Sequence, residues 1–309
     1  NPRESVIDEI NNKAVKMAKK EKDNSVYRFN YYNRKEKICV NTMVSLDENK
    51  NPMPTFIVFN GNTQEHYLAK ELIVPEGYKL CVPPMIGLYG KLYRDIVFPD
   101  TIITDEVKSA DIDAMITTNL KAWNLHPEDY YVIARNYIKF TWLFERFRYR
   151  PYLYLYGDWG TGKSSFGSHI VRLCQNGFVM MDISAPALAR MLEMTNSVVM
   201  LDEMEKLDKA EADKMNTILR NGYEENGAYV VAEQEAKKFS PTMYYVDQPK
   251  ILVRRQMTKD DALRSRIIPF NMIPRDKDIP DSMRKSDEGN TYEERRLEAV
   301  NITNLLLKW

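Results

Sequence analysis

The feature that most constrains the fold of this chain is a glycine-rich segment, Gly157-Asp-Trp-Gly-Thr-Gly-Lys-Ser164. It follows the apolar run Tyr152–Tyr156 and precedes residues 166–174, which have a helical composition. Glycines allow successive backbone N–H groups to turn inward around a phosphate, and the start of the helix adds a partial positive charge. The segment therefore predicts a strand, a phosphate-binding loop and a helix rather than an ordinary glycine-rich turn.

The same pattern assigns chemistry to individual side chains. We expect the Lys163 amine to reach the β- and γ-phosphates of a nucleotide, and the Ser164 hydroxyl to ligate Mg²⁺. The sequence thus predicts ATP and Mg²⁺ as cofactors. The residues of this segment expected to contact the nucleotide are Gly157, Gly160, Thr161, Gly162, Lys163, Ser164 and Ser165.

A second motif, Ser197-Val-Val-Met-Leu-Asp202-Glu203, predicts a buried strand that ends in two acids. We expect Asp202 to hold the Mg²⁺ ion through its water shell, and Glu203 to orient and deprotonate the attacking water. Adjacent acids at a strand end are common on protein surfaces, but the phosphate loop upstream favours a catalytic role. A catalytic acid that activates water also argues against a small-molecule kinase.

Further apolar runs at 177–182 and 249–253, and a short helix at 261–266 that leads into a last strand, complete an α/β pattern. Strands that alternate with helices predict a parallel sheet with right-handed crossovers. Gln256 follows the 249–253 strand, at the edge where the phosphates would lie. It is expected to hydrogen-bond the γ-phosphate or the lytic water; alternatively, the polar residues at 254–256 only solvate the strand end.

The chain has 309 residues, with 44 Lys plus Arg and 44 Asp plus Glu, so net charge indicates no polyanion partner. The chain is long enough to form two hydrophobic cores. Short β-rich runs broken by turn signals occupy residues 27–100, and helical periodicity begins near residue 111. We predict a small mixed α+β domain at 1–108, a nucleotide-binding core with leading helices at 109–275, and a C-terminal loop and helix at 276–309.

The segment 11–37 is rich in Lys and Arg, interleaved with Tyr27, Phe29, Tyr31 and Tyr32. This composition suits contacts with nucleic-acid phosphates and bases, but a solvated helix followed by an edge strand has the same composition and is the favoured interpretation. Composition also predicts where the protein works. No apolar run is long enough to cross a bilayer, and the three dispersed cysteines, Cys39, Cys81 and Cys174, indicate neither a disulfide framework nor a zinc site. We therefore expect a cytoplasmic protein with no membrane partner.

Residues 150–272 resemble the core of an AAA+ ATPase. The resemblance rests on the two nucleotide motifs, the strand before Gln256 and the segment Leu263-Arg-Ser-Arg266. The resemblance implies that Arg266, with Arg264 as the reserve, projects into the nucleotide site of a neighbouring subunit. It also implies a homo-oligomeric ring, with a hexamer expected. The alternative for Arg266 is an ion pair with a carboxylate of its own chain.

A narrower resemblance is to superfamily 3 helicases of viruses, phages and plasmids, which implies a chain encoded by such an element or working in a prokaryotic host. It rests on the short spacing of the two motifs, the segment 218–223 and an insertion at 228–245. Gln256 departs from the asparagine usual in that group. The insertion implies a hairpin that grips single-stranded or forked DNA, with Lys237, Lys238 and Phe239 at its turn; a solvated hairpin is the alternative.

The resemblance implies a ring-forming DNA helicase or translocase that couples ATP hydrolysis to movement along single-stranded DNA. One alternative is a helicase loader or protein-remodelling AAA+ ATPase. Another is a structural or packaging scaffold gated by nucleotide. A C-terminal helix is expected to act as a lid or to pack against a neighbour, with Arg284, Arg295 or Arg296 reaching the nucleotide.

Overall fold

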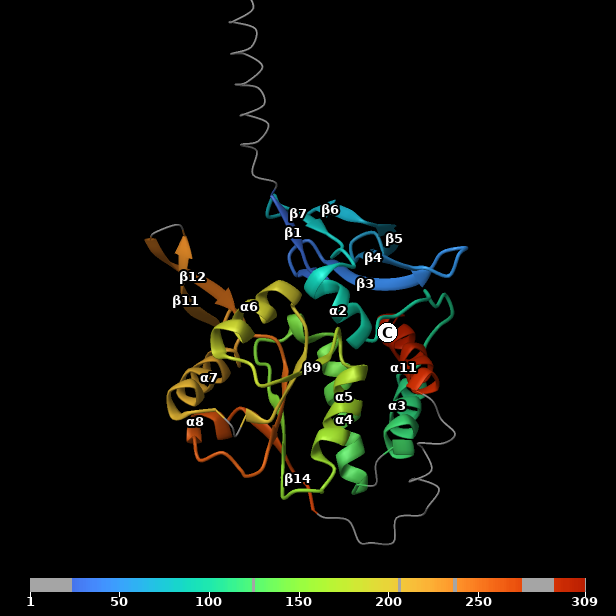
Figure 1. Cartoon of the computed structure of the whole chain (residues 1–309). Coiled ribbons are helices and arrows are strands. Elements are labelled where there is room, and N and C mark those ends of the chain that lie inside the picture. The colour runs from blue at the N-terminus through green and yellow to red at the C-terminus, as the bar shows by residue number, and fades with distance from the viewer. Residues whose placement is uncertain (1–23, 124–125, 205–206, 236–237, 274–291, 309) are drawn as a thin grey trace, which may run out of the picture.

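The computed structural model describes residues 24–123, 126–204, 207–235, 238–273 and 292–308. At its centre lies a five-stranded parallel sheet in the order β14-β8-β13-β10-β9 (Figure 1). This confirms the predicted α/β class. The strands are β8 (Tyr152–Tyr156), β9 (Phe178–Met181), β10 (Val199–Asp202), β13 (Lys250–Arg254) and β14 (Ile267–Asn271).

Helices cover both faces of this sheet, as a parallel sheet of near-continuous apolar strands requires. Along β8 the side chains alternate: Leu153 and Leu155 enter one hydrophobic core, whereas Tyr152 and Tyr154 enter the other. The first core is formed with α3 (Ser109–Trp123), α4 (Glu128–Thr141), α5 (Lys163–Leu173) and α11 (Tyr292–Lys308). The second is formed with α2 (Gly87–Asp95), α6 (Ala185–Thr195), α7 (Lys209–Asn221) and α8 (Asp261–Arg264).

Helix α4 begins directly after Pro127, with Glu128 and Asp129 in its first turn. Ala134, Tyr137 and Thr141 line its buried face. Three- and four-residue spacing brings these side chains together on one stripe. The chain then turns through a short 3-10 helix, η1 (Phe144–Arg146), before it enters β8.

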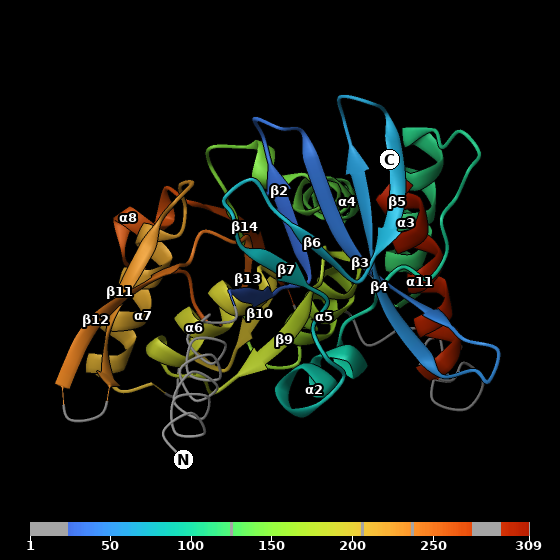
Figure 2. The same cartoon turned by 90° about the horizontal axis from the view of Figure 1, so that it is seen from above.

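The N-terminal part of the described chain is a β region that lies over the parallel-sheet part (Figures 1 and 2). It contains a four-stranded antiparallel sheet, β2-β3-β4-β5, and a three-stranded mixed sheet, β1-β7-β6. Phe29 is fully buried and joins the same hydrophobic core as Tyr152 and Tyr154. Residues on both sides of the predicted 108/109 boundary thus share a core. The strands are β1 (Ser25–Tyr27), β2 (Asn30–Asn33), β3 (Ile38–Leu46), β4 (Pro52–Asn60), β5 (Glu65–Ala69), β6 (Glu71–Ile73) and β7 (Lys79–Cys81).

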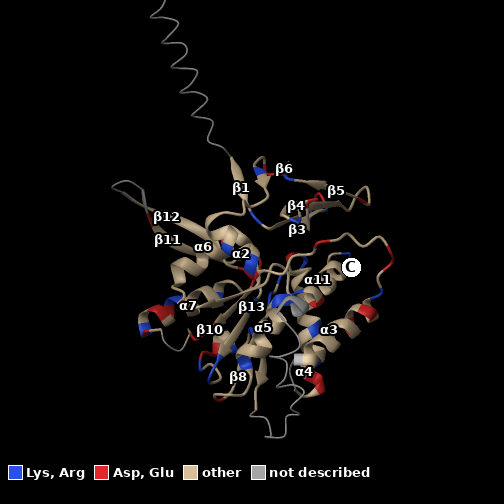
Figure 3. Ribbon diagram, turned by 45° about the vertical axis from the view of Figure 1, so that its right-hand side comes forward, with Lys and Arg blue, Asp and Glu red and all other residues tan. Residues whose placement is uncertain are grey.

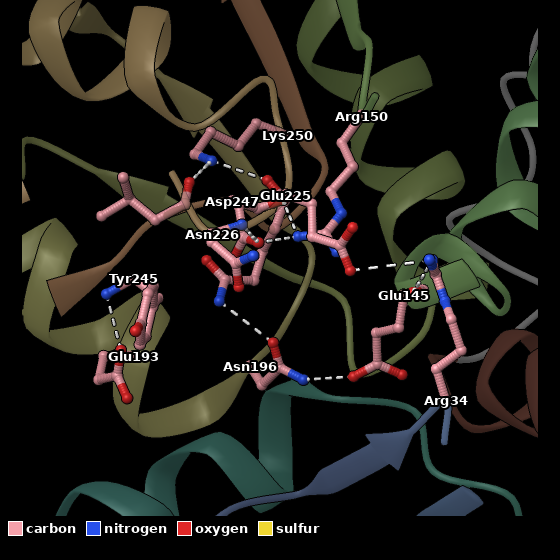
Figure 4. A network of polar contacts seen from close by, with 12 residues as sticks. Arg34, Glu145, Arg150, Glu193, Asn196, Glu225, Asn226, Tyr245, Asp247 and Lys250 are labelled. Atoms are coloured by element: carbon pink, nitrogen blue, oxygen red, sulfur yellow. Dashed lines mark hydrogen bonds and ion pairs between the residues drawn. The ribbon is translucent and has the colours of Figure 1, made fainter. Parts of the chain in front are cut away.

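A network of polar groups lies at the amino ends of the parallel strands (Figure 4). Arg150, just before β8, forms a buried ion pair with Asp247, which precedes β13. The amide of Asn196 donates to the Glu145 carboxylate at 2.7 Å. Arg34 of the N-terminal β region donates to the Glu145 carbonyl at 3.4 Å. The network therefore ties the N-terminal β region to the amino edge of the sheet.

Two ionisable groups of this network have strongly shifted pKa values. Burial raises the pKa of Glu145 to about 7, against the opposing hydrogen bond from Asn196. Burial lowers the pKa of Lys250 to about 7, although its Nζ donates to the carbonyls of Val246 (2.6 Å) and Gln248 (2.7 Å). A cavity of about 220 Å³ lies beside Glu145, between the N-terminal β region and the sheet. It is at the sheet edge opposite the phosphate loop, and paired charges line it.

An antiparallel hairpin of β11 (Ala228–Glu235) and β12 (Lys238–Tyr245) extends to one side of the molecule (Figure 1). Helix α6 contacts both arms of the hairpin. Arg190 forms an ion pair with Glu233 of β11 at 2.8 Å, and Glu193 accepts from the Tyr245 backbone amide at 2.7 Å. The predicted hairpin is therefore present.

Charged residues of both signs are spread over the described elements (Figure 3), as expected for a neutral chain. Among the helices that the structure describes, none has the length and apolar composition needed to cross a membrane.

Candidate nucleotide-binding site

The glycine-rich loop lies between β8 and α5, where the sequence predicts it. It begins at the carboxyl edge of the sheet, where the Gly157 amide donates to the Arg255 carbonyl at 3.2 Å. A Cβ atom at Gly157 would collide with the carbonyl oxygen of Met272, which follows β14. Only glycine therefore allows the start of the loop to pass this close to the neighbouring chain segment.

The loop ends as α5 begins, and Gly162 is the N-cap residue with φ of +80°. This left-handed conformation is readily accessible to glycine and turns the chain into the helix. Ser164 and Ser165 lie exposed in the first helical turn, where backbone N–H groups have no partner within the helix. The Thr161 side chain is buried and donates to the Asp158 carbonyl at 2.9 Å. Exposed Gly160 completes the loop.

Lys163 lies over this loop. Its Nζ donates to the Asp158 carbonyl at 2.6 Å and lies 3.4 Å from the Thr161 hydroxyl. The amine is thus already at the loop that the glycines form, in a position suited to anionic oxygens. A phosphate there would meet a charged donor and the start of α5 together.

The two predicted acids lie at the carboxyl end of β10, on the same edge of the sheet as the loop. Asp202 is 7% exposed, whereas Glu203 is exposed. Because β13 alone separates β10 from β8, the loop and Asp202 are two strand spacings apart, roughly 10 Å. This separation leaves room for a phosphate group and a hydrated Mg²⁺ ion between them.

Glu203 has an unusual backbone conformation. Its φ is +56°, and its amide donates to the Asp202 carboxylate at 2.8 Å. For a residue with a Cβ atom the left-handed region costs of order 1–2 kcal/mol, and such outliers cluster at functional sites. Strand β10 therefore ends in a sharp turn that carries the acid pair.

Gln256 lies exposed just past the end of β13, at the carboxyl edge of the sheet and between the loop and the acid pair. Its carbonyl accepts from the Tyr154 hydroxyl at 2.8 Å. Sequence reasoning missed the contact beside it: the Arg255 guanidinium lies over the Trp159 ring, 5.8 Å from its centroid. The available signal was a large aromatic residue within an otherwise small and polar loop.

Arg266 lies at the opposite edge of the sheet, immediately before β14. Its guanidinium donates to the Ala262 carbonyl and lies 5.5 Å from the centroid of the Tyr223 ring. The structure therefore does not bring Arg266 to the phosphate loop of its own chain. The reserve candidate, Arg264, forms an exposed ion pair with Asp261 at 3.5 Å.

The hairpin differs in one respect from the sequence prediction. β12 begins at Lys238, so Lys238 and Phe239 belong to an arm of the hairpin, paired with Glu235 and Gln234. Phe239 is 71% exposed. Lys237 lies outside the described residues.

The C-terminal helix does not place Arg296 at the loop. Arg296 donates to the Arg94 carbonyl at 2.8 Å, at the end of α2. Ala299, Ile302 and Leu306 are buried in the core that α11 shares with α3 and α5. The helix thus packs on its own chain. Arg284 and the side chain of Arg295 lie outside the described residues.

The aromatic residues of the 11–37 segment also differ in exposure. Phe29 and Tyr31 are buried in hydrophobic cores and are unavailable for stacking on bases, whereas Tyr27 is 41% exposed. Arg28 forms an ion pair with Glu193 of α6. The lysines of 11–23 lie outside the described residues.

Among the described residues, side chains alone do not form a metal site. Within the described ranges, no group of three or more His, Cys, Asp or Glu residues is arranged to hold a metal ion. Mg²⁺ in nucleotide sites takes one or two protein ligands together with phosphates and water. Ser164 and Asp202 fit that limited role.

The fold and this edge of the sheet define an α/β protein with a phosphate-loop sequence at the carboxyl end of β8. Comparison with protein-family models gave no match, and neither did comparison with curated proteins.

Among solved structures, the chain is similar to JCV helicase over 65% of its length. A complex of JCV helicase with a thiazolopyridinyl-phenoxy-phenyl acetamide has a TM-score of 0.37 and 14% identity. An inhibitor-bound structure of JCV helicase has a TM-score of 0.37 and 12% identity. A further X-ray structure of JCV helicase has a TM-score of 0.35 and 13% identity. The matched part covers 54–55% of the JCV helicase chains, about half of their length.

Proposed function

We propose that this chain is an ATPase that works as a ring and couples hydrolysis to movement along single-stranded DNA. The observation that carries the proposal is the strand order β8-β13-β10. It brings the phosphate loop, the end of β13 and the Asp202–Glu203 pair to one edge of the sheet. Ligands of open α/β sheets bind at the carboxyl ends of the strands.

In this proposal each residue of the edge has one task. The loop amides and Lys163 hold the phosphates, and Ser164 and Asp202 hold Mg²⁺, which when bound neutralises charge on the phosphates. Glu203 accepts a proton from the attacking water. The position of Arg266 at the far edge supports a role in a neighbouring subunit rather than in its own.

The test is a comparison of wild type with Glu203→Gln in ATP binding and steady-state hydrolysis, with and without single-stranded oligonucleotides. We expect Glu203→Gln to bind ATP with unchanged affinity and to lose hydrolysis by at least about 100-fold, as for a general base. We expect single-stranded DNA to raise the wild-type rate. A nucleotide-gated scaffold predicts negligible turnover in both proteins. Strand separation on a forked duplex then tests helicase activity directly.

A second candidate is a remodelling ATPase whose partner is protein. Exposed apolar side chains on both arms of the hairpin favour it, because Val230, Phe239 and Met243 are each more than half exposed. Such residues mark protein contacts as readily as base stacking. Hydrolysis that is insensitive to DNA would support this candidate against the first.

A further inference from the structure

The cavity of about 220 Å³ at the amino edge of the parallel sheet has no part in the proposed ATPase site. Its lining includes Tyr32 of β2, Glu145 of η1 and Tyr245 at the end of β12. Asn226, just before β11, also lines it, so the cavity is at the base of the hairpin (Figure 4). Three parts of the chain that are far apart in the sequence therefore meet at one site.

The charged side chains of the cavity wall are already paired. Three arginines of the wall each have a carboxylate partner there, and the pairs are Arg28 with Glu193, Arg34 with Glu225, and Arg150 with Asp247. The remaining acid, Glu145, accepts from the Asn196 amide at 2.7 Å, and burial raises its pKa to about 7. A charged ligand would have to break a pair and leave one partner uncompensated, whereas an uncharged ligand leaves the pairs intact. The wall therefore favours a ligand without net charge.

The wall also has hydrogen-bonding groups that the described chain does not pair. Gln248 is 3% exposed, and its amide donates to the Asn196 side-chain oxygen at 3.1 Å, but its Oε1 has no partner among the described residues. Arg150 is 4% exposed, and its Nε has no partner there either. Buried polar atoms of native proteins are usually paired with protein, ligand or ordered water. One unpaired atom is an acceptor and the other a donor, so the matching ligand carries both kinds of group.

The size of the cavity limits the ligand further. Its volume is below the roughly 300–1,000 Å³ of sites for drug-sized ligands and would hold about seven water molecules. One small planar ring system fits this space better than a whole nucleotide or a peptide segment. Tyr245 is 41% exposed, so its ring offers an accessible face at the point where the cavity opens to solvent.

We propose that this cavity binds a nucleobase, with the face of the base against Tyr245 and its edge toward Gln248 and Arg150. A nucleobase is planar and uncharged, carries donors and acceptors along its edge, and stacks on aromatic side chains. The lining supports this ligand, because Tyr32 and Arg34 belong to the segment 11–37, which is rich in cations and aromatic residues. The base comes either from a free nucleoside or from an unpaired position of a single strand. The site is separate from the proposed ATPase chemistry, because it lies at the sheet edge opposite the phosphate loop.

Titration of the whole chain with each of the four common deoxynucleosides, followed by saturation-transfer NMR, tests the site. We expect wild type to bind at least one of them. Tyr245→Leu should weaken that binding at least about fivefold, the loss expected for one stacked base. Tyr245→Phe keeps the ring and should bind within about twofold of wild type. Tyr67→Leu is the matched control, because Tyr67 is 52% exposed on β5 and does not line the cavity, and it should bind like wild type.

Competition with a single-stranded oligonucleotide then identifies the source of the base. Displacement of the nucleoside assigns the site to a base within a strand, whereas no displacement assigns it to a free nucleoside, and both results support a nucleobase site. If wild type binds none of the nucleosides, or if Tyr245→Leu binds as tightly as wild type, the cavity holds only water and the proposal is overturned. None of these results depends on ATP hydrolysis, so a failure here leaves the proposed ATPase function untouched.

The fold of the variants is checked independently. Tyr245 is partly exposed, and its main-chain amide, which donates to Glu193, is present in every variant. Urea denaturation should therefore give similar midpoints for Tyr245→Leu and Tyr245→Phe. Loss of nucleoside binding by both variants would overturn the stacking role, because the ring alone would then not be sufficient.

Discussion

The backbone amide of Tyr152 donates a 3.0 Å hydrogen bond to the Arg266 carbonyl, so Arg266 lies beside the first residue of β8. The phosphate loop follows the last residue of the same five-residue strand. At about 3.3 Å per residue, the strand separates the two sites by roughly 16 Å. Arg266 therefore reaches a nucleotide only if that nucleotide is bound by another copy of the chain.

Mixing two inactive variants tests this arrangement. Arg266→Ala should lower kcat by at least about 10³ with ATP binding intact, as expected for an arginine that acts between subunits. Lys163→Ala should weaken ATP binding in its own subunit but keep its Arg266. Steady-state hydrolysis should reappear when the two variants are mixed. A mixture no more active than the separate variants, or isolated subunits as fast as the assembled protein, would contradict the trans role.

Replacement of Phe239 by alanine should weaken binding of a labelled single-stranded oligonucleotide by about 1–3 kcal/mol, the usual contribution of one stacked base. Fluorescence anisotropy measures the affinity, and basal ATP hydrolysis should not change. Phe59→Ala is the matched control, because Phe59 is 40% exposed on β4, away from the hairpin. Equal affinities for the two variants would remove the hairpin from the DNA-binding surface.

The raised pKa of Glu145 predicts a pH dependence of stability. Burial raises its pKa to about 7 in the folded protein, above the usual value of a free glutamate. Between these two values the folded state binds more protons than the unfolded state, so the free energy of unfolding falls as pH rises toward 7. Chemical denaturation from pH 4.5 to 7.5 measures the slope.

In that experiment Glu145→Gln should flatten the slope, because the amide does not titrate and still accepts from Asn196. The neighbouring groups Arg150, Asp247 and Arg28 remain in both proteins, so the difference between the two curves isolates Glu145. Identical slopes for wild type and variant would show that Glu145 is ionised with an ordinary pKa.

Breaking the buried ion pair between Arg150 and Asp247 should lower the free energy of unfolding much more than breaking an exposed ion pair. Asp247→Ala leaves the guanidinium buried without its partner, which should cost about 3–5 kcal/mol of unfolding free energy. Glu224→Ala breaks an exposed ion pair with Arg148 and should cost no more than about 1 kcal/mol. Urea denaturation compares the two. Equal losses would mean that solvent already screens the Arg150–Asp247 pair.

Local sequence patterns were sufficient to predict most elements of the candidate nucleotide site at the carboxyl edge of the sheet. The strand at 152–156, the glycine loop and the helix after it follow from apolar burial and from backbone conformations that glycine favours, both of which depend on nearby residues. The start of β12 could not be found this way. Lys238-Phe-Ser-Pro has no alternating pattern, and these residues are in a strand because β11 supplies the pairing.

By itself the sequence determined that a phosphate loop follows a buried strand, and that a second buried strand ends in Asp202 and Glu203. Only the tertiary structure decided that β13 lies between these strands, which brings Arg255 to Trp159 and leaves Arg266 at the far edge. Strand order depends on the way in which the long crossover connections cover both faces of the sheet. It also depends on contacts between residues far apart in the chain. Residue spacing along the sequence does not contain that information.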